Sequence, residues 1–297
     1  MARLNDVDVA YARVLRDLLD QPLQPDRTGV GIHELFGSVS LSFTDTANAF
    51  PILSLKRTNY DAAFDELRWM LSGSTNVNDL SSSIWNEWAD ENGDLGPTYG
   101  AQLRHFSTGW DVQVEEVDQV ANFMVGLVRN PTSRRHLITL VNPLDEPYQA
   151  LPPCISLIQG RVLDGTLHLS VYQRSADWFL GVPFDIVAWT YFLHLMAAWA
   201  QLEPGDIHFH YGSAHLYANH VDQAREVLRR FDTSAKPDVY AGTAEGEKPR
   251  LNLRYVRPHP TRVSEAAAQL WLKQLQSTSF SVSAYHPDRP ITAPVAV

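Results

Sequence analysis

The sequence predicts an α+β fold in which helices pack on one large sheet of mixed or antiparallel strands. Three observations support this class. Segments of helical and strand character alternate irregularly, unlike the regular alternation that builds a doubly wound parallel sheet. Asp164-Gly165 separates two strand-like segments, which is a strong hairpin signal. Residues 185–201 are apolar almost all round, as expected of a helix buried at the centre of a domain.

The N-terminal part of the chain predicts one helix and two strands. Residues 7–20 carry apolar side chains at helical spacing, and Pro22 and Pro25 end this amphipathic helix. Segments 32–43 and 51–55 have the composition of short strands. We therefore expect the chain to enter the sheet soon after its first helix.

The middle of the chain predicts two more helices around a long loop. Residues 60–72 form an apolar-periodic helix that Gly73 closes. The stretch 74–110 is rich in loop-forming and aromatic residues, and 113–129 alternates acidic and apolar positions as a helix would. A long aromatic loop inside a domain is often functional, so this stretch is a candidate binding segment.

The C-terminal half returns to strands and closes with a proline-rich tail. Strands are predicted at 136–141, 154–163, 167–173 and 206–211, with a last helix at 216–230. No repeat, linker or change in composition marks a boundary. We therefore expect a single catalytic domain spanning residues 1–297.

The charge balance limits the class of partner. The chain has 24 Lys and Arg against 34 Asp and Glu, which gives a formal net charge of −10. A surface this acidic repels nucleic acid and anionic membranes, so we expect neither as a partner. An anionic substrate would need a local cluster of arginines.

The cysteine content and the absence of long apolar segments indicate in which cellular compartment we expect the protein. A single cysteine excludes an intramolecular disulfide and a cysteine-rich zinc site, and we expect no metal. The N-terminus lacks an apolar signal region, and we see no apolar run of about 18 residues. We therefore expect a cytoplasmic protein.

The single cysteine, Cys154, is a candidate nucleophile. It follows Leu-Pro-Pro at the start of a predicted strand, where it is also compatible with an inert buried side chain. The chain supplies arginines beside small or polar residues, namely Arg27, Arg134, Arg135 and Arg174. Such arginines bind phosphate in bidentate geometry and lower the pKa of a nearby thiol, although each is also compatible with a solvated surface position.

Other residues could contact a ligand. Trp85 and Trp88 lie three apart in a stretch with carboxylates and a Gly-Pro turn, and could stack a flat heteroaromatic group or anchor the core. Glu66 on an apolar helix is either exposed at its edge or held in a pocket with a raised pKa. His215 and Tyr217 could bind sugar hydroxyls or be satisfied core residues.

Together these motifs resemble the thymidylate synthase family over nearly the whole chain. The resembling segments are Asp-Arg-Thr-Gly (26–29), Phe-Pro-Ile-Leu-Ser-Leu-Lys-Arg (50–57), the run from Ile84 to Gly100, Ser-Arg-Arg (133–135), Leu-Pro-Pro-Cys (151–154), the run from Tyr172 to Phe184, Ala-His-Leu-Tyr-Ala-Asn-His (214–220) and Ala-Pro-Val-Ala-Val (293–297). The resemblance implies the family's α+β fold, with one face of the sheet forming a homodimer interface.

The resemblance also implies a chemistry. Cys154 would add to C6 of a pyrimidine nucleoside monophosphate, so that C5 becomes a carbon nucleophile and accepts a one-carbon unit from the co-substrate 5,10-methylenetetrahydrofolate. Catalytic roles are implied for Cys154, Glu66, Tyr99, Asp185 and Arg174. Substrate contacts are implied for Arg27, Arg174, Ser175, Asp177, Asp185, His215 and Tyr217, joined by Arg134 and Arg135 from the other subunit.

A third group of residues is implied for the reduced folate. These are Lys56 at its glutamate tail, and Ile84, Trp85, Trp88, Asp177, Leu180, Gly181, Phe184 and Ala296 around the rest of it. The C-terminal residues would close over the site as a lid.

Three positions depart from the uracil-using members of the family. Asp185 replaces the asparagine after Val-Pro-Phe, Ile155 replaces the histidine after the nucleophile, and Ser213 replaces an aspartate. A carboxylate accepts a hydrogen bond from the N4 amino group of cytosine but offers no donor to O4 of uracil. If N3 gains a proton during the attack on C6, the carboxylate also stabilises that cation. We have no physical explanation for Ser213.

The change from asparagine to Asp185 resembles the deoxycytidylate hydroxymethylases. The sequence therefore predicts folate-dependent C5 hydroxymethylation of a cytosine nucleoside monophosphate, dCMP or CMP. The alternatives are C5 methylation of dCMP, thymidylate synthesis from dUMP, and an inactive relative that binds nucleotides or RNA. Trp85 and the closing tail resemble the methyl-forming enzymes, so the type of product stays open at this point.

Overall fold

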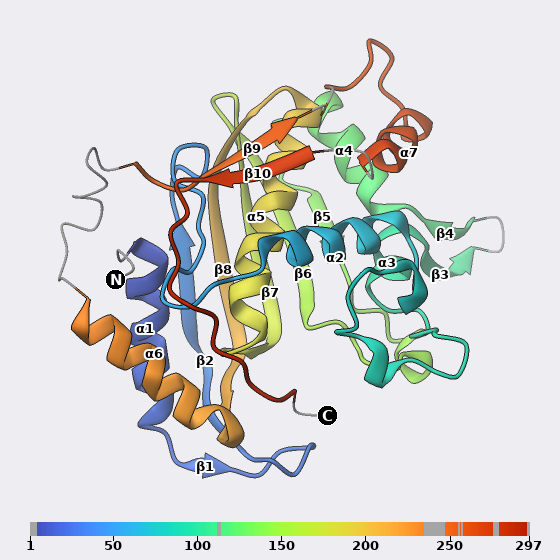
Figure 1. The fold of residues 1–297 in the computed structure, drawn as a ribbon. Helices are drawn as coiled ribbons and strands as arrows, with labels where there is room; N and C mark the ends of the chain where they lie inside the picture. The colour runs from blue at the N-terminus through green and yellow to red at the C-terminus, as the bar shows by residue number, and fades with distance from the viewer. Residues whose placement is uncertain are drawn as a thin grey trace.

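A six-stranded mixed sheet forms the centre of the computed structural model, which describes residues 5–111, 114–234, 247–254, 256, 258–275 and 279–295 (Figure 1). Its strands lie in the order β1-β2-β8-β7-β6-β5. Their bounds are β1 Leu23–Gln24, β2 Ile32–Phe43, β5 His136–Thr139, β6 Ile155–Leu163, β7 Thr166–Asp177 and β8 Glu203–Tyr217. The pair β7 and β8 is parallel and every other neighbouring pair is antiparallel. The predicted α+β fold with a large mixed sheet is confirmed.

Helices and two small hairpin sheets surround this centre. The helices are α1 Asp6–Leu19, α2 Tyr60–Ser72, α3 Tyr99–Arg104, α4 Gln119–Arg129, α5 Gly181–Ala200, α6 Val221–Thr233 and α7 Glu265–Gln274. Short 3₁₀ turns are η1 Val77–Asp79, η2 Asn86–Trp88, η3 Glu146–Tyr148 and η4 Ala218–His220. The two-stranded sheets pair β3 Phe106–Asp111 with β4 Val114–Val117, and β9 Arg250–Arg254 with β10 Ser279–Ser283.

Helix α5 connects the parallel strands β7 and β8 and packs on both of them. Its outer side is covered by α2, so large side chains such as Trp189 and Tyr191, which are two residues apart and project from opposite sides of the helix, are both buried. By length and composition α5 could cross a membrane, but 72% of its most apolar stretch is buried inside the protein. Burial in the core explains why the segment is apolar all round.

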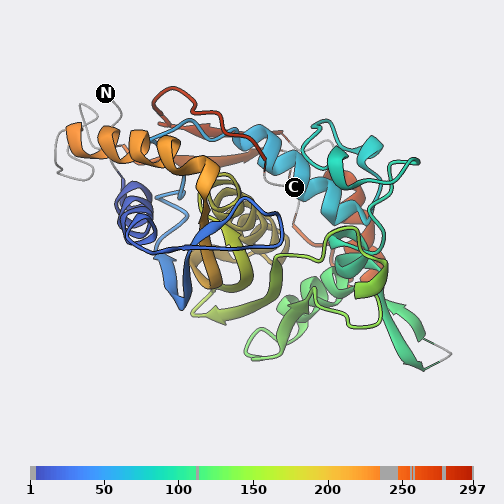
Figure 2. The ribbon, with the colours of Figure 1, turned by 90° about the horizontal axis from the view of Figure 1, so that it is seen from below.

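The two faces of the sheet differ in what covers them. Helices α1, α5 and α6 lie on the same side (Figure 2), and inward side chains such as Val39, Leu41 and Phe209 are buried there. Among the described residues, no helix covers the centre of the opposite face. Leu157 and Tyr172 form a directly opposed pair on that face and are both exposed.

Local signals account for most element boundaries. The hairpin between β6 and β7 turns at Asp164 and Gly165, whose φ angles of 46° and 79° are those of the predicted two-residue turn. Gly73 ends α2 with a φ of 89°, a left-handed conformation that glycine adopts without strain. Asn5 begins α1 in a capping box with Asp8.

Some predicted elements were wrong or incomplete. Residues 51–55 are buried but form no strand, and their backbone contacts include the Asp8 carboxylate, which accepts from the amide nitrogens of Ser54 and Leu55 at 2.7 and 3.1 Å. The predicted helix 113–129 begins only at Gln119, capped by Asp118.

The C-terminal elements also differ from those predicted. The expected helix 216–230 starts at Val221 because β8 continues through Tyr217. Short β9, α7 and β10 were not predicted, since their apolar patterns are brief and the region is rich in proline.

Candidate active site

A cavity of about 560 Å³ opens at one end of the central sheet. The pairing of the strands brings the end of β7, the end of β8, the start of β2 and the start of β6 to this edge. The predicted site residues that line the cavity are Arg27, Glu66, Ile84, Trp85, Trp88, Tyr99, Cys154, Arg174, Ser175, Asp177, Leu180, Gly181, Phe184, Asp185, His215 and Tyr217. Residues far apart in sequence therefore meet in one site.

Cys154 lies immediately before β6, facing Arg174 on β7. The backbone nitrogen of Arg174 donates to the Cys154 carbonyl at 2.8 Å. The Arg174 guanidinium donates to the carbonyls of Pro153 and Pro152 at 2.9 and 2.7 Å, so its charge is held beside the thiol. Burial raises the pKa of Cys154 to about 11, while the charge of Arg174 favours the thiolate. The thiol is therefore protonated at neutral pH unless nearby positive charge stabilises the thiolate, and Arg174 supplies part of that charge.

Tyr99, the first residue of α3, fixes the backbone at Cys154. Its hydroxyl accepts a hydrogen bond from the Cys154 amide nitrogen at 2.8 Å. Burial raises the pKa of Tyr99 well above its usual value, so the phenol keeps its proton. That proton is available for donation to an acceptor in the cavity.

Glu66 projects from α2 into the same space. The indole nitrogen of Trp85 donates to Glu66 Oε1 at 2.6 Å, which fixes both side chains. Burial, with a smaller contribution from the negative charge of Asp185, raises the pKa of Glu66 to about 7. A carboxyl group with this pKa can accept or release a proton near neutral pH.

Asp185 lies on the second turn of α5 and is held by Gln173, a residue that the sequence analysis gave no role. The Gln173 amide nitrogen, Nε2, donates to Asp185 Oδ2 at 2.8 Å. Burial raises the pKa of Asp185 to about 7 even though this hydrogen bond lowers it. The Gln173 carbonyl oxygen is buried without a hydrogen-bond partner among the described residues.

A sequence signal for Gln173 exists in β7. Leu167, Leu169 and Val171 alternate along the strand and point into the core, and Gln173 continues the same row as a buried polar residue. A polar side chain at the end of an inward apolar row points to a function or a polar partner. Here the partner is Asp185.

The loop before β2 presents Arg27 at the mouth of the cavity. Asp26 Oδ2 accepts from the backbone nitrogen and the hydroxyl of Thr28 at 3.0 and 2.8 Å, and Oδ1 accepts from Gly31 at 2.8 Å. These bonds shape the turn, so the exposed Arg27 side chain stands at a defined place. Arg27 and Arg174 line the same cavity, and together they make one end of the site positively charged.

The ends of β7 and β8 add polar groups. Ser175 pairs with Ser213, and Asp177 pairs with His215, in the parallel register of these strands. Ser213, which was unexplained from sequence, lines the cavity, and its hydroxyl lies 3.5 Å from His215 Nδ1.

An apolar shelf forms the opposite wall. It consists of Ile84, Trp85, Trp88, Leu180 and Phe184. The rings of Trp85 and Trp88 meet edge to face with centroids 5.7 Å apart. A flat aromatic group fits against such a surface.

One comparison with known proteins identifies this arrangement. A family model described as Thymidylate synthase matches residues 9–297. The chain belongs to the thymidylate synthase family. Membership indicates folate-dependent one-carbon transfer to a pyrimidine nucleotide, with methylenetetrahydrofolate as the co-substrate. Within the described part of the chain, no group of three or more His, Cys, Asp or Glu side chains could hold a metal ion.

Three of the described residues that were expected at a thymidylate synthase site, Lys56, Arg134 and Arg135, do not line the cavity of this chain. Lys56, expected at the folate tail, is buried, with its ammonium group donating to the Phe179 carbonyl and 3.9 Å from the Phe179 ring centroid. Burial lowers the pKa of Lys56 to about 8. Arg134 and Arg135 are exposed between α4 and β5. Ala296 lies outside the described residues, whereas the neighbouring Val295 lines the cavity.

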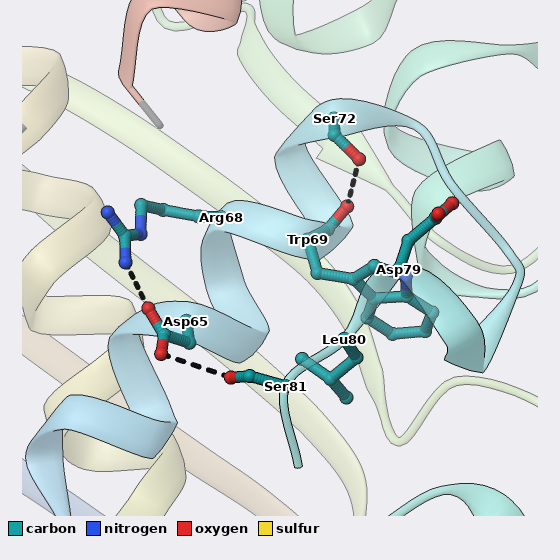
Figure 3. A pocket seen from close by; sticks show the side chains of 7 residues that line it. All are labelled: Asp65, Arg68, Trp69, Ser72, Asp79, Leu80 and Ser81. Carbon is teal, nitrogen blue, oxygen red and sulfur yellow. Dashed lines mark hydrogen bonds and ion pairs between the residues drawn. The ribbon is translucent and has the colours of Figure 1, made fainter. Parts of the chain in front are cut away.

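A second cavity, of about 420 Å³, lies at α2 (Figure 3) and does not share lining residues with the first. It is lined by Asp65, Arg68, Trp69, Ser72, Asp79, Leu80 and Ser81. Asp65 pairs with Arg68 and accepts from the Ser81 hydroxyl at 3.3 Å. Because Glu66 on the same helix enters the active-site cavity, these contacts help to fix the helix that carries it.

Proposed function

We propose that this protein transfers a one-carbon unit to C5 of a cytosine nucleoside monophosphate and releases the hydroxymethyl product, with dCMP as the first expected substrate and CMP as the second. The observation that carries the proposal is a carboxyl group, Asp185, in the cavity that holds Cys154. The family match over residues 9–297 supports one catalytic domain, for which we propose a cytoplasmic location.

Cys154 is the proposed nucleophile. Its thiolate would add to C6 of the base, so that electron density moves to C5 and C5 can bond to the incoming carbon. Arg174, anchored by the two proline carbonyls before Cys154, would favour the thiolate and also meet the 5′-phosphate. The same cation thus serves nucleophile and substrate.

Two arginines of one chain line the proposed phosphate site. Arg27, Arg174 and Ser175 line it, and Arg134 and Arg135 lie elsewhere on the surface. We propose that Arg134 and Arg135 act in the cavity of a second copy in a homodimer. The uncovered face of the sheet, with exposed Leu137, Leu157 and Tyr172, supports that face as the interface.

Base selection is assigned to Asp185. With Oδ2 accepting from Gln173, Oδ1 is the oxygen that remains for the base. A carboxylate accepts from the cytosine N4 amino group, whereas the O4 of uracil would face it without a donor. Rejection through an unpaired buried polar group reaches factors of about 10⁴. Ile155, in place of a histidine, is fully buried and adds no donor for O4.

The remaining polar residues are assigned to proton transfer and to the sugar. Glu66, with a pKa raised to about 7, would exchange protons with water near the base, and the Tyr99 phenol would donate. His215 and Tyr217 would bind the sugar 3′-hydroxyl. Their rings stand nearly perpendicular, with centroids 5.0 Å apart.

The folate would lie against the apolar shelf. Ile84, Trp85, Trp88, Leu180 and Phe184 offer flat apolar surface, and Asp177 and Gly181 add polar backbone and side-chain groups at the start of α5. This composition fits a planar ring system that carries hydrogen-bond donors. When bound, methylenetetrahydrofolate supplies the one-carbon unit.

The nature of the product depends on whether water reaches the exocyclic methylene carbon that is left on C5 when the folate departs. A methyl product is the alternative, and one observation favours it: Val295 of the C-terminal segment lines the cavity, so the site has a closing element that could exclude water. We propose the hydroxymethyl product because Asp185 resembles the hydroxymethylases.

Tritium release from C5-labelled nucleotide tests the proposal. We expect release from dCMP, dependent on methylenetetrahydrofolate, and much slower release from dUMP. Release from dUMP alone would replace the proposal with thymidylate synthesis, and no release from dCMP, CMP or dUMP would indicate an inactive relative. The folate product separates the two cytosine reactions, because methylation forms dihydrofolate and hydroxymethylation forms tetrahydrofolate.

A further inference from the structure

We propose that His220 is a positioning residue that couples Asp177, on the cavity wall, to the C-terminal segment that brings Val295 to the cavity. The idea rests on the proposed function in one respect, which is that Asp177 and this segment serve the folate side of the site. None of the motifs discussed above gives His220 a role.

His220 is fixed at the end of η4, after β8, and its side chain is fully buried. The ring of Phe179 lies against it with centroids 5.5 Å apart, and the ring of Tyr217 with centroids 5.7 Å apart. Phe179 follows Asp177 closely in the chain, and Tyr217 lines the cavity. The imidazole therefore packs against both rings, which restrict its rotation.

One ring nitrogen of His220 holds the C-terminal segment. Nε2 lies 2.6 Å from the carbonyl oxygen of Pro294, and because a carbonyl only accepts, Nε2 carries the hydrogen. The segment runs from β10 across the molecule to this point (Figure 1). Beyond Arg289, this is the only hydrogen bond that the described part of the segment makes. Ile291 and Ala293 pack against the core, and the hydrogen bond at Pro294 adds a polar contact next to Val295.

The other ring nitrogen faces Asp177. Nδ1 is 3.8 Å from Asp177 Oδ1, too far for a hydrogen bond, and it is buried without a partner among the described residues. Asp177 Oδ1 is already held by the backbone nitrogens of Phe179 and Leu180 at 2.9 and 3.2 Å. A buried ring nitrogen without a hydrogen-bond partner has an uncompensated desolvation cost, so a small movement of Asp177 changes the energy of this contact.

A ligand that hydrogen-bonds to Asp177 would change this contact. It would shift or neutralise the carboxylate that Nδ1 faces, and the ring would transmit the change to Pro294 because both nitrogens belong to one rigid plane. The coupling should therefore concern the folate, through Asp177, and should leave nucleotide binding at Arg27 and Arg174 unchanged.

Two variants separate the two ring nitrogens. In His220→Gln, the amide nitrogen reaches the place of Nε2 and can still donate to Pro294. In His220→Asn, the shorter amide reaches only the place of Nδ1. We expect His220→Asn to raise the KM for methylenetetrahydrofolate about tenfold with the nucleotide Kd unchanged, and His220→Gln to stay within about twofold of wild type.

Digestion by a carboxypeptidase provides a readout of the C-terminal segment that needs no turnover. Faster removal of the C-terminal residues from His220→Asn than from His220→Gln, at equal melting temperature, is the expected result. Equal digestion of the two variants, or equal loss of folate and nucleotide binding, would overturn the coupling. Wild type that is inactive on every nucleotide would contradict the proposed function, whereas the digestion result tests the contact between His220 and Pro294 independently of it.

If the variants do not fold, the tautomer of His220 in the wild-type protein tests the proposed coupling. Nitrogen NMR of histidine-labelled protein should show a ring with its hydrogen on Nε2. Its Nδ1 signal should move when methylenetetrahydrofolate is added to the nucleotide complex, and not with nucleotide alone. Finding the hydrogen on Nδ1, or no response to the folate, would overturn the proposal.

Discussion

Gln173 donates a hydrogen bond to Oδ2 of the Asp185 carboxyl group, 2.8 Å away, and Oδ1 is the oxygen that we propose meets the base. The pair joins the end of β7 to the second turn of α5, two rigid elements of the core. An acceptor held this firmly can discriminate between bases, because it cannot rotate away from a mismatched group. The predictions below begin with this pair.

Asp185→Asn should shift the preference of the enzyme from cytosine toward uracil. The carboxamide keeps an acceptor and gains a donor for O4, so kcat/KM for dCMP should fall by roughly 10²-fold or more and that for dUMP should rise. Steady-state kinetics with both nucleotides measure the change, with Asp17→Asn, exposed on α1, as the matched control. Unchanged base preference would remove Asp185 from base selection.

Activity on dCMP should rise with pH through about 7. The pKa of Asp185 is raised to about 7 by burial, so the carboxylate is the minor form at pH 6 and the major form at pH 8. Glu66 has a pKa of about 7 as well, so the two groups contribute to one limb of the profile.

Gln173→Met tests which of the two carboxyl groups matters more. The hydrogen bond from Gln173 lowers the pKa of Asp185, so its loss should move the limb to higher pH and reduce kcat/KM for dCMP about tenfold. In Asp185→Asn, any rise of activity with pH near 7 would be due to the titration of Glu66. A profile that Gln173→Met does not move would assign the limb to Glu66 in wild type too.

Cys154→Ser should abolish turnover and leave nucleotide binding largely intact. A serine hydroxyl does not add readily at C6, whereas the groups proposed for phosphate and sugar lie elsewhere in the cavity. Calorimetric titration with dCMP measures binding, and tritium release from C5 measures attack. Substantial release by the serine variant would show that another group is the nucleophile.

Mixed dimers should recover activity that neither parent shows. One chain carries Arg134→Ala and Arg135→Ala, and the other carries Cys154→Ser, so a heterodimer keeps one complete site if these arginines act across the interface. Activity near half that of wild type per heterodimer is expected. Heterodimers that form but stay inactive would confine each site to one chain.

The sequence made the cavity largely predictable because its residues lie in unbroken motifs at strand ends. The Asp164-Gly165 turn sets the pairing of β6 with β7, and that register brings Cys154 beside Arg174. The pattern of residues 51–55 misled because apolar side chains become buried in a loop as well as in a strand. Periodicity alone does not separate the two.

Other features depended on contacts that no motif records. Lysine side chains usually lie on the surface. The ammonium group of Lys56 is instead buried beside Phe179, because the packing of distant segments, and not the local sequence, decides its burial. No function was expected for Gln173 from the sequence, because glutamine is uncharged and its neighbour Arg174 is the evident candidate for binding an anion. Its partner, Asp185, is far enough along the chain that only the fold reveals the pair.

Competition between dCMP and dUMP tests the central claim most directly. Wild-type protein is given equimolar amounts of both nucleotides with methylenetetrahydrofolate, and the products are weighed by mass spectrometry. The account predicts that dCMP is consumed first and gains the mass of one CH₂O unit, while dUMP persists. Consumption of dUMP first, with a gain of one CH₂ unit, would contradict it.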